Sequence, residues 1–511
     1  MRNSWIMLLL LFFFTVCAKA QLVPQDAMKG MVRGINIGNT MESPGEGDWG
    51  NPPIQERAFD DYKNAGFNAI RIPITWDKHT SASLPYSIVA SWLNRVEQVV
   101  DWGLKRGLII IINAHHEDWI KNSYTPANKA RFDSIWSQIA TRLKDKSDSL
   151  IFEIINEPYP MTLQNVNDLN ARTLKIIRMA NPTRIVSFSG YQWSNSAELV
   201  TAAIPDSNDK YLMGYYHSYD PYPFGLNGPG TYGSNSDINA TKAKFDQVNA
   251  WSNRNKIPVI LGEFGYQIAC EYNSRMCAYA TVVDQGLRHG IPTFTWDDGG
   301  NFPIYNRTTG GFNEIKDVLI HTYKESPNTM KISAYADSSI KIQWTNRTTE
   351  NDSIIVERKV DASNFGFFAR ILPTASEFID STTSAGRTYY YRLKANLKDS
   401  IEIQSYPVRL KAISTTSVAM QNVPAGFKLF NNYPNPFNPS TTISFSLPSR
   451  SFVTLKVYDV IGRDVATIVS EDLKEGIHTR QWNAQGLSSG VYYYRIQAGY
   501  FTETKKLMVL K

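Results

Sequence analysis

The feature that most constrains this chain is a regular alternation of short apolar runs with longer helical patterns between Met31 and Tyr323. Such alternation is typical of a strand–helix repeat, which builds a parallel sheet. The candidate strands are Val32–Ile37, Asn68–Pro73, Leu108–Asn113, Leu150–Asn156, Arg184–Phe188, Leu212–His217, Pro258–Glu263 and Pro292–Trp296. The helices between them include Ser91–Arg106, Ala130–Lys144 and Leu163–Met179. Because a (β/α)₈ barrel needs about 250 residues, we predict an α/β fold of the (β/α)₈ TIM barrel type.

An open doubly wound sheet is the competing arrangement. It predicts a glycine-rich phosphate turn after an early strand. The first candidate strand carries Gly34-Ile35-Asn36-Ile37-Gly38, which does not have that spacing. The barrel is therefore the better interpretation.

The spacing of the apolar residues changes after Lys324, where the alternation typical of strands replaces the helical period. Turn residues separate these patterns at short intervals, which favours small all-β sandwiches. We expect a signal peptide at 1–20, a catalytic barrel at 21–326, a β-sandwich at 327–412, a Ser- and Thr-rich linker at 413–426 and a second β-sandwich at 427–511.

The N-terminus has the three parts of a secretory signal. Arg2 precedes the apolar run Ile6–Phe14, and Ala18-Lys19-Ala20 forms a small-residue cleavage site. The run is too short to span a bilayer, and we expect no transmembrane segment after cleavage. The chain is thus predicted to be exported.

Charge excludes one class of partner. The 53 Lys and Arg residues are dispersed among 47 Asp and Glu residues, giving a net charge of +6 with no basic arm or stripe. A nucleic-acid partner is therefore not expected. We expect a monomer.

Cleavage would leave two cysteines, Cys270 and Cys277. Their short separation in an exported protein favours a local disulfide, and a pair of free thiols is the alternative. No set of residues has the spacing of a zinc site.

Polar residues gather where the candidate strands end, which is where active sites of such barrels lie. The residues at these ends are Arg71, Asn113, His115, His116, Glu117, Asn156, Glu157, His217, Tyr219, Glu263, Trp296 and Asp298. Each one alone has an ordinary structural explanation, such as a salt bridge, a hydrogen-bonded core histidine or packing. Their joint occurrence at strand ends indicates a catalytic site.

Glu157 and Glu263 follow the fourth and seventh strands, so they face each other across the barrel mouth. Paired carboxylates are what glycosidic hydrolysis requires. Arg71 and Tyr219 are suited to keep Glu263 ionised, which leaves Glu157 as the acid/base. Glu157 follows an apolar strand, so we expect burial to raise its pKa. Capping of the next helix is the alternative for Glu157.

Two further residues suit sugar binding. Asn156 could hydrogen-bond the 2-hydroxyl, and Trp296 offers a flat face for a sugar ring. Other loop aromatics are equally compatible with packing or with substrate stacking, namely Trp49, Trp76, Trp119, Trp193, Tyr222 and Phe224.

Several of these motifs resemble glycoside hydrolase family 5, especially its bacterial endo-β-1,4-glucanases. They are Asn156-Glu157-Pro158, Leu261-Gly262-Glu263-Phe264-Gly265, Asn113-Ala114-His115-His116-Glu117, Arg71-Ile72-Pro73 and Trp49-Gly50-Asn51-Pro52-Pro53. The resemblance implies a retaining mechanism with Glu157 as acid/base and Glu263 as nucleophile, without metal or organic cofactor. It implies substrate binding by Arg71, His115, Asn156, His217, Tyr219 and Trp296, and makes Asn39, His116, Trp193 and Asp298 further candidates.

The implied substrate is β-1,4-glucan. Mannanases and xyloglucan hydrolases share the family's motifs, so these activities stay open. A non-catalytic glycan-binding protein is a third alternative, but binding alone does not require a carboxylate pair.

The last two modules carry weaker resemblances. Residues 328–412 look like a fibronectin type III module with Trp344 in its core, acting as a spacer or, alternatively, as a carbohydrate binder. The tail resembles the C-terminal sorting domain of type IX secretion, through Asn432–Thr441, Val457–Arg463, Leu487–Tyr492 and Lys505–Leu507. That resemblance implies contact with secretion machinery and delivery to the cell surface or medium.

Overall fold

The computed structural model describes residues 21–335, 338–348, 353–397, 401–413, 426–499 and 501–510. The predicted signal peptide and residues 414–425 of the predicted linker lie outside this part. The chain divides into two compact units: Met1–Lys331 with Gln343–Glu377 and Tyr390–Arg409, and Ile332–Ile342 with Phe378–Tyr389 and Leu410–Lys511.

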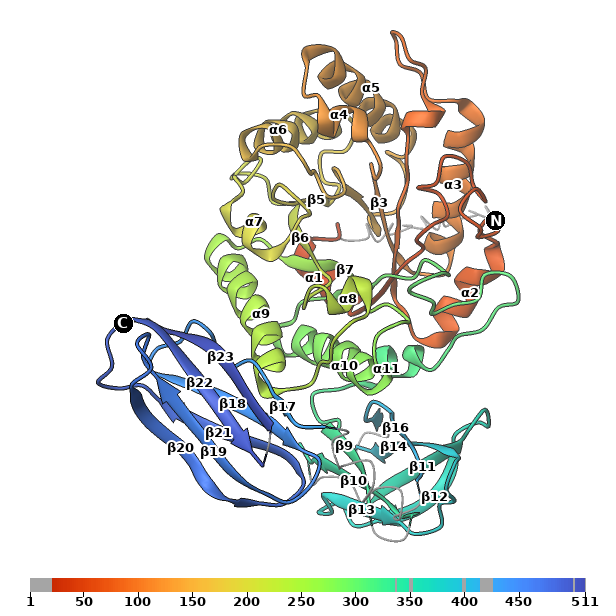
Figure 1. Cartoon of the computed structure of the whole chain (residues 1–511). Helices are drawn as coiled ribbons and strands as arrows, with labels where there is room; N and C mark the ends of the chain where they lie inside the picture. The colour runs from red at the N-terminus through yellow and green to blue at the C-terminus, as the bar shows by residue number, and fades with distance from the viewer. Residues whose placement is uncertain are drawn as a thin grey trace, which may run out of the picture. The chain divides into compact units, whose positions relative to one another are not determined.

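The first unit contains a closed parallel barrel whose eight strands are paired in chain order, β1 to β8 (Figure 1). The strands are β1 Arg33–Asn36, β2 Ala69–Ile72, β3 Ile109–Asn113, β4 Leu150–Glu153, β5 Val186–Phe188, β6 Leu212–Ser218, β7 Val259–Phe264 and β8 Thr293–Thr295. Pairing of Gly34 with Phe294 joins β1 to β8 and closes the ring. The predicted fold class is confirmed, with every candidate strand present.

One strand boundary differs in a way that matters for the site. The predicted strand Leu150–Asn156 is wrong in its last three residues, because β4 ends at Glu153. Ile154 N still bonds to Ser187 O on β5, but Asn156 N bonds to Ala114 O beyond β3. The chain therefore leaves β4 and turns toward β3 just before Glu157.

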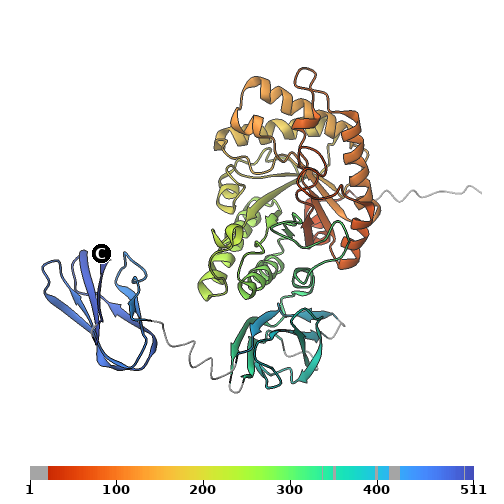
Figure 2. The same cartoon turned by 45° about the vertical axis from the view of Figure 1, so that its right-hand side comes forward.

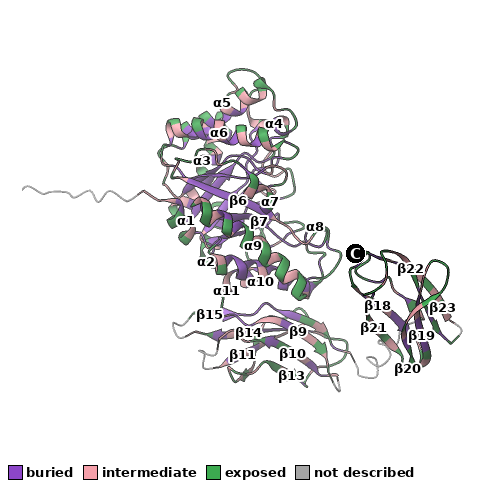
Figure 3. Ribbon diagram, turned by 90° about the vertical axis from the view of Figure 1, so that its left-hand side faces the viewer, coloured by how far each residue is buried: buried purple, intermediate pink, exposed green. Residues whose placement is uncertain are grey.

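Helices surround the strands, as the rotated view in Figure 2 also shows. They are α1 Pro24–Gly30, α2 Glu56–Ala65, η1 Asp77–His79, α3 Ala90–Lys105, α4 Asp118–Asn122, α5 Pro126–Arg142, α6 Leu163–Ala180, α7 Ser196–Thr201, α8 Phe224–Asn227, α9 Asn235–Asn255, α10 Tyr272–His289 and α11 Ile315–His321. Their outer faces are exposed whereas the strands are buried (Figure 3). No helix among the described residues is both long and apolar enough to cross a membrane.

The barrel interior is filled by side chains from successive strands. Ile109, Ile111, Ile151, Ile260 and Phe294 form one buried cluster with Met31 and Ala27 of the α1 region. A Cβ at Gly34 would lie 2.4 Å from Phe294 Cδ1, so only glycine fits beside that ring. This packed interior holds the strand ends in fixed positions.

The remaining described residues form antiparallel sheets. One sheet has the order β13-β10-β9, a second β12-β11-β14-β15 with β16 on β14, a third β17-β18-β21 and a fourth β20-β19-β22-β23. Their strands are β9 Asn328–Ala334, β10 Ile340–Thr345, β11 Ile354–Val360, β12 Gly366–Ile371, β13 Glu377–Asp380, β14 Thr388–Asn396, β15 Glu402–Gln404, β16 Val408–Lys411, β17 Lys428–Leu429, β18 Ser440–Leu447, β19 Ser451–Tyr458, β20 Asp464–Leu473, β21 Gly476–Asn483, β22 Gly490–Ala498 and β23 Phe501–Val509. Trp344 on β10 is buried, and the fibronectin type III assignment stays a prediction.

Candidate active site

Arg71, on β2, is the centre of the cluster at the barrel mouth and is fully buried. Its Nε and Nη2 donate to Glu153 at 2.8 and 2.6 Å, and its Nη1 donates to Glu263 Oε1 at 2.6 Å. Nη1 also reaches Asn36 Oδ1 and Nη2 reaches Asn156 Oδ1. Burial lowers the pKa of Arg71, but the charges of Glu153 and Glu263 outweigh that effect, so the net pKa is raised. Arg71 is thus a permanent buried cation.

Glu263, on β7, is held through both carboxylate oxygens. Oε1 accepts from Arg71, and Oε2 accepts from the Tyr219 hydroxyl at 2.8 Å. Burial and the charge of Glu263 raise the pKa of Tyr219 well above its ordinary value, so its hydroxyl stays a donor. Two donors, one of them a permanent cation, therefore fix the position of the Glu263 carboxylate.

Glu157 lies close to Glu263 and contacts His217. A hydrogen bond of 2.9 Å joins His217 Nδ1 to Glu157 Oε1. One oxygen of each glutamate and a His217 ring nitrogen lie within 4.8 Å of one another. The backbone of Glu157 has φ +36°, in the left-handed region that non-glycine residues rarely adopt.

The raised pKa expected for Glu157 is wrong. Burial raises the pKa of Glu157. The hydrogen bond and charge of His217, followed by the charges of Lys121 and Arg71, lower the pKa by more than burial raises it, so the net pKa lies below its ordinary value. The apolar strand before Glu157 indicated the first effect only. The second depends on β6 and α4, which are distant in sequence.

His115 and Trp296 form one wall of the site. Their rings stack at 6.0 Å, and Asn113 Nδ2 lies 3.1 Å from His115 Nδ1. Burial, together with the charges of His116 and Arg71, lowers the pKa of His115 well below its ordinary value, so the imidazole is neutral. A Cβ at Gly38 would lie 2.6 Å from Trp296 Cζ2, so the indole packs directly on the first loop.

The four further candidates lie around this centre. His116 contacts Trp49 edge-on at 5.5 Å, and the half-exposed Trp193 stacks on Tyr159 at 4.1 Å. Asn39 O accepts from Asn51 Nδ2, and one Asp298 oxygen accepts from the backbone of Gly300 and Phe302. Asn39 and Asp298 therefore make structural contacts that order the rim.

The structure brings in residues that the sequence reasoning did not select. Glu153 and Asn36 contact Arg71 directly, and Asn113 Nδ2 donates to Glu153 at 2.8 Å. Lys121 on α4 is buried beside the same loops. The sequence did contain a signal for Glu153, because it is a charged residue at the end of an otherwise apolar strand. A buried acid in a strand needs a buried partner.

The local disulfide predicted between Cys270 and Cys277 is absent. Both thiols are free and buried, and Cys270 Sγ donates to Phe224 O at 3.0 Å. Cys270 precedes α10, whereas Cys277 lies in its second turn beside Gly233. Because α10 begins between the two cysteines, Cys270 contacts Phe224 whereas Cys277 lies beside Gly233.

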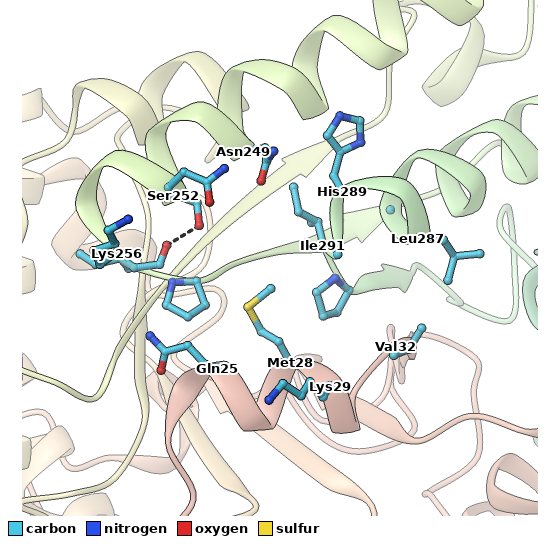
Figure 4. Close-up of a pocket in the computed structure, with 16 residues that line it drawn as sticks. Gln25, Met28, Lys29, Val32, Asn249, Ser252, Lys256, Leu287, His289 and Ile291 are labelled. Atoms are coloured by element: carbon cyan, nitrogen blue, oxygen red, sulfur yellow. Dashed lines mark hydrogen bonds between the residues drawn. The ribbon is translucent and has the colours of Figure 1, made fainter. Parts of the chain in front are cut away.

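A separate cavity of about 620 Å³ lies between α1, the end of α9 and the end of α10 (Figure 4). Met28, Lys29, Ser252, Lys256 and His289 line it, and Ser252 Oγ donates to Ile257 O at its edge. None of the candidate site residues lines this cavity. It is therefore distinct from the carboxylate cluster.

The fold and the paired, differently held carboxylates define a class of protein, the barrel hydrolases that act on glycosidic bonds. Residues 28–301 match the model of the cellulase family, glycosyl hydrolase family 5. The chain belongs to this family. Residues 431–510 match the secretion system C-terminal sorting domain.

Curated relatives support the same assignment. Endoglucanase H of Acetivibrio thermocellus is 45% identical over 58% of this chain and 34% of its own length. Endoglucanase B of Clostridium cellulovorans is 34% identical over 57% of this chain and 72% of its own length. The chain thus spans about a third of the first relative and most of the second.

Solved structures agree with the fold. Endoglucanase Cel5A of Thermotoga maritima has 33% identity and a TM-score of 0.56, covering 58% of this chain and all of that one. The same enzyme was also solved in complex with mannotriose. A tri-modular endo-β-1,4-glucanase of Bacillus licheniformis, at 24% identity and a TM-score of 0.64, covers 95% of this chain and shares its fold.

Proposed function

We propose that this chain is a retaining endo-β-1,4-glucanase in which Glu263 is the nucleophile and Glu157 is the acid/base. The observation that carries the proposal is the different treatment of the two carboxylates. Glu263 accepts hydrogen bonds from Arg71 and Tyr219, while Glu157 has a single histidine partner. The more tightly held carboxylate suits the nucleophile, and the one with fewer partners suits proton exchange.

In the first step Glu263 attacks the anomeric carbon. The glycosidic C–O bond breaks, a glycosyl ester forms, and the leaving oxygen takes the proton of Glu157. In the second step Glu157 removes a proton from water, which attacks the anomeric carbon and frees Glu263. Atoms and charges balance without a metal or cofactor.

The surroundings of Glu157 suit both steps. Burial raises its pKa and favours the protonated form needed first. The hydrogen bond from His217 and the charges of Lys121 and Arg71 lower its pKa and favour the ionised form needed second. The second set of contributions is the larger, so the net pKa of Glu157 lies below its ordinary value and the ionised form is favoured.

Retention follows from the spacing of the carboxylates. Retaining enzymes place the two groups about 5–5.5 Å apart, whereas inverting enzymes leave about 6.5–9.5 Å for a water. Oxygens of Glu157 and Glu263 lie within 4.8 Å of each other. That separation supports direct attack by Glu263.

Other residues are proposed to bind the sugar. Asn156, oriented by Arg71, would hydrogen-bond the 2-hydroxyl, and Trp296 would stack on a ring. Exposed Trp49, Trp193 and Tyr222 extend the aromatic surface along the rim, which suits a polymer. Trp76 and Phe224 are buried and are assigned to packing.

The assignment to β-1,4-glucan rests on the endoglucanase relatives. Mannan is the second candidate, because a solved relative was crystallised with mannotriose. Xyloglucan shares the same backbone linkage and belongs in the same test.

The module boundaries are proposed as 21–326 for catalysis, 327–412 for a spacer and 427–511 for export. The match to a sorting domain supports delivery to the cell surface or medium through secretion machinery. We propose that the enzyme acts as a monomer.

The deciding experiment is hydrolysis of carboxymethylcellulose, lichenan, glucomannan, mannan and xyloglucan by the chain from residue 21. We expect the highest kcat/KM on carboxymethylcellulose or lichenan, with a rapid loss of viscosity from internal cleavage. Activity on mannan alone would replace the glucanase proposal with a mannanase. No hydrolysis of any of them would overturn the enzyme proposal.

A further inference from the structure

Lys121 is a buried cation beside the proposed active site, and the two-step reaction described above does not use it. It lies on α4, directly after the loop that carries His115 and His116, and is 6% exposed. Its Nζ donates to His115 O at 2.7 Å. Lysine is rarely buried to this degree, so its retention here needs an explanation.

No carboxylate in the described part of the chain lies within salt-bridge distance of Lys121. The nearby Glu117 is not a direct partner, because its oxygens accept from Trp76 N at 2.6 Å and Trp119 Nε1 at 2.7 Å. The charge of Lys121 is therefore not cancelled by a contact ion pair. A charge held this way in a low-dielectric site acts on other groups over several ångströms.

Several titratable groups face this region. The groups acting on Lys121 are Glu157, Asp118, Glu117 and Glu263, and Lys121 in turn acts on His115 and His116. Glu157 itself is influenced by His217, Lys121 and Arg71, and its charge also acts on Tyr219 and His116. The backbone joins the two loops next to these groups: Asn156, just before Glu157, donates from its N–H to Ala114 O at 2.9 Å, and Lys121 holds the next carbonyl, His115 O.

We propose that Lys121 is a positioning residue for the acid/base: it anchors the backbone of His115 and places a buried positive charge beside Glu157, which sets the pH range of catalysis. The inference rests on the proposed function. Lys121 does not touch the reacting atoms. It stabilises the ionised form of Glu157, the form that activates water in the second step.

Burial lowers the pKa of Lys121 by more than the charges of Glu157 and the neighbouring acids raise it, so the net pKa lies below its ordinary value. A lysine ammonium starts from a pKa of about 10.4, so one that donates to a carbonyl keeps its proton at acidic pH. The charge is therefore present where a glycosidase of this kind exchanges the proton of Glu157.

Three substitutions separate the charge from the anchoring hydrogen bond. Lys121→Gln keeps a donor for His115 O and removes the charge. Lys121→Met removes both, and Lys121→Arg keeps both. Lys242→Gln is the matched control, since Lys242 is an exposed lysine on α9 paired with Asp246.

The measurement is kcat/KM against pH with a neutral oligosaccharide that the parent chain hydrolyses. We expect the alkaline limb of Lys121→Gln and Lys121→Met to move up by about 0.5–1 pH unit, because Glu157 keeps its proton longer. Lys121→Arg should restore the parent profile, and Lys242→Gln should leave it unchanged. Thermal unfolding of each variant shows which of them fold.

Two results would overturn the inference. The first is an unshifted profile in folded Lys121→Gln. The second is a lower rate at every pH in Lys121→Met, combined with a parent-like pH profile in Lys121→Gln. That combination would mean that Lys121 only anchors the backbone of His115. Failure of the proposed function is a different outcome, because the parent chain itself would then show no hydrolysis.

Discussion

Arg71 Nη1 lies 2.6 Å from Glu263 Oε1, and the same guanidinium holds Glu153 with its other two nitrogens. Arg71 thus joins β2, β4 and β7 inside the barrel. A guanidinium cannot lose its proton in a protein, so Glu263 always has a cation in direct contact.

Replacing the proposed nucleophile should remove activity without unfolding the barrel. We expect Glu263→Ala to lower kcat by roughly a thousand-fold or more on a β-glucan. Added azide should restore turnover of an aryl glycoside and give the α-glycosyl azide, because azide attacks from the vacant side. A rate within a few-fold of the parent would show that Glu263 is not the nucleophile.

Glu153 has no step in the proposed reaction, but we expect it to contribute strongly to the stability of the fold. Glu153→Gln leaves the buried Arg71 short of one charge, which costs about 3–5 kcal/mol of unfolding free energy. Urea denaturation followed by fluorescence measures it. Glu97→Gln is the control, because Glu97 pairs with Arg142 and Lys146 at the surface and should cost less than about 1 kcal/mol. Equal losses in the two variants would contradict the prediction.

The contact between His217 and Glu157 should be visible in the pH profile. His217→Ala removes the hydrogen bond and charge that lower the pKa of Glu157. The pKa of Glu157 should then rise, and the alkaline limb of kcat/KM should move to higher pH. His289→Ala on α10, which loses contacts with Asp246 and with Gln285 O away from the carboxylate cluster, is the matched control. A limb that stays in place or moves to lower pH would refute the assignment.

Gly38 should affect substrate binding through Trp296. A methyl group at Gly38 would overlap the indole at 2.6 Å, so Gly38→Ala must displace the ring. We expect KM for cello-oligosaccharides to rise several-fold with a smaller change in stability. Gly300→Ala on the same rim adds a Cβ 3.6 Å from its nearest atom, Asp298 Oδ1, and should bind like the parent. An unchanged KM in Gly38→Ala would argue against stacking on Trp296.

The two cysteines should react as free thiols. Thiol titration of the chain from residue 21 should detect almost none while it is folded and two per chain in denaturant. Reducing agent should leave the melting temperature unchanged. Fewer than two thiols in denaturant would indicate that a disulfide forms after all.

The fold was accessible from the sequence because each barrel strand is a short apolar run with a polar residue at or close to its C-terminal end. The site was partly accessible for the same reason, since Arg71, Glu157 and Glu263 stand at or beyond those ends. Glu153 was missed because local apolarity predicts packing and does not reveal a partner 82 residues away.

Two other differences have the same origin. The pKa of Glu157 is lowered mainly by His217, on a strand that the sequence around Glu157 does not indicate. The cysteine side chains diverge because α10 begins between them, and the direction of a helical side chain depends on how the helix packs. Local patterns therefore predicted elements and their ends, whereas pairwise contacts required the structure.

The left-handed backbone of Glu157 has a consequence for protein engineering. A residue with a side chain stores about 1–3 kcal/mol in such a conformation, and glycine or asparagine relieves it. A search that selects only for heat resistance will therefore favour Glu157→Gly or Glu157→Asn. The resulting chain would be more durable and inert, so thermal selection of this enzyme has to be coupled to a selection for turnover.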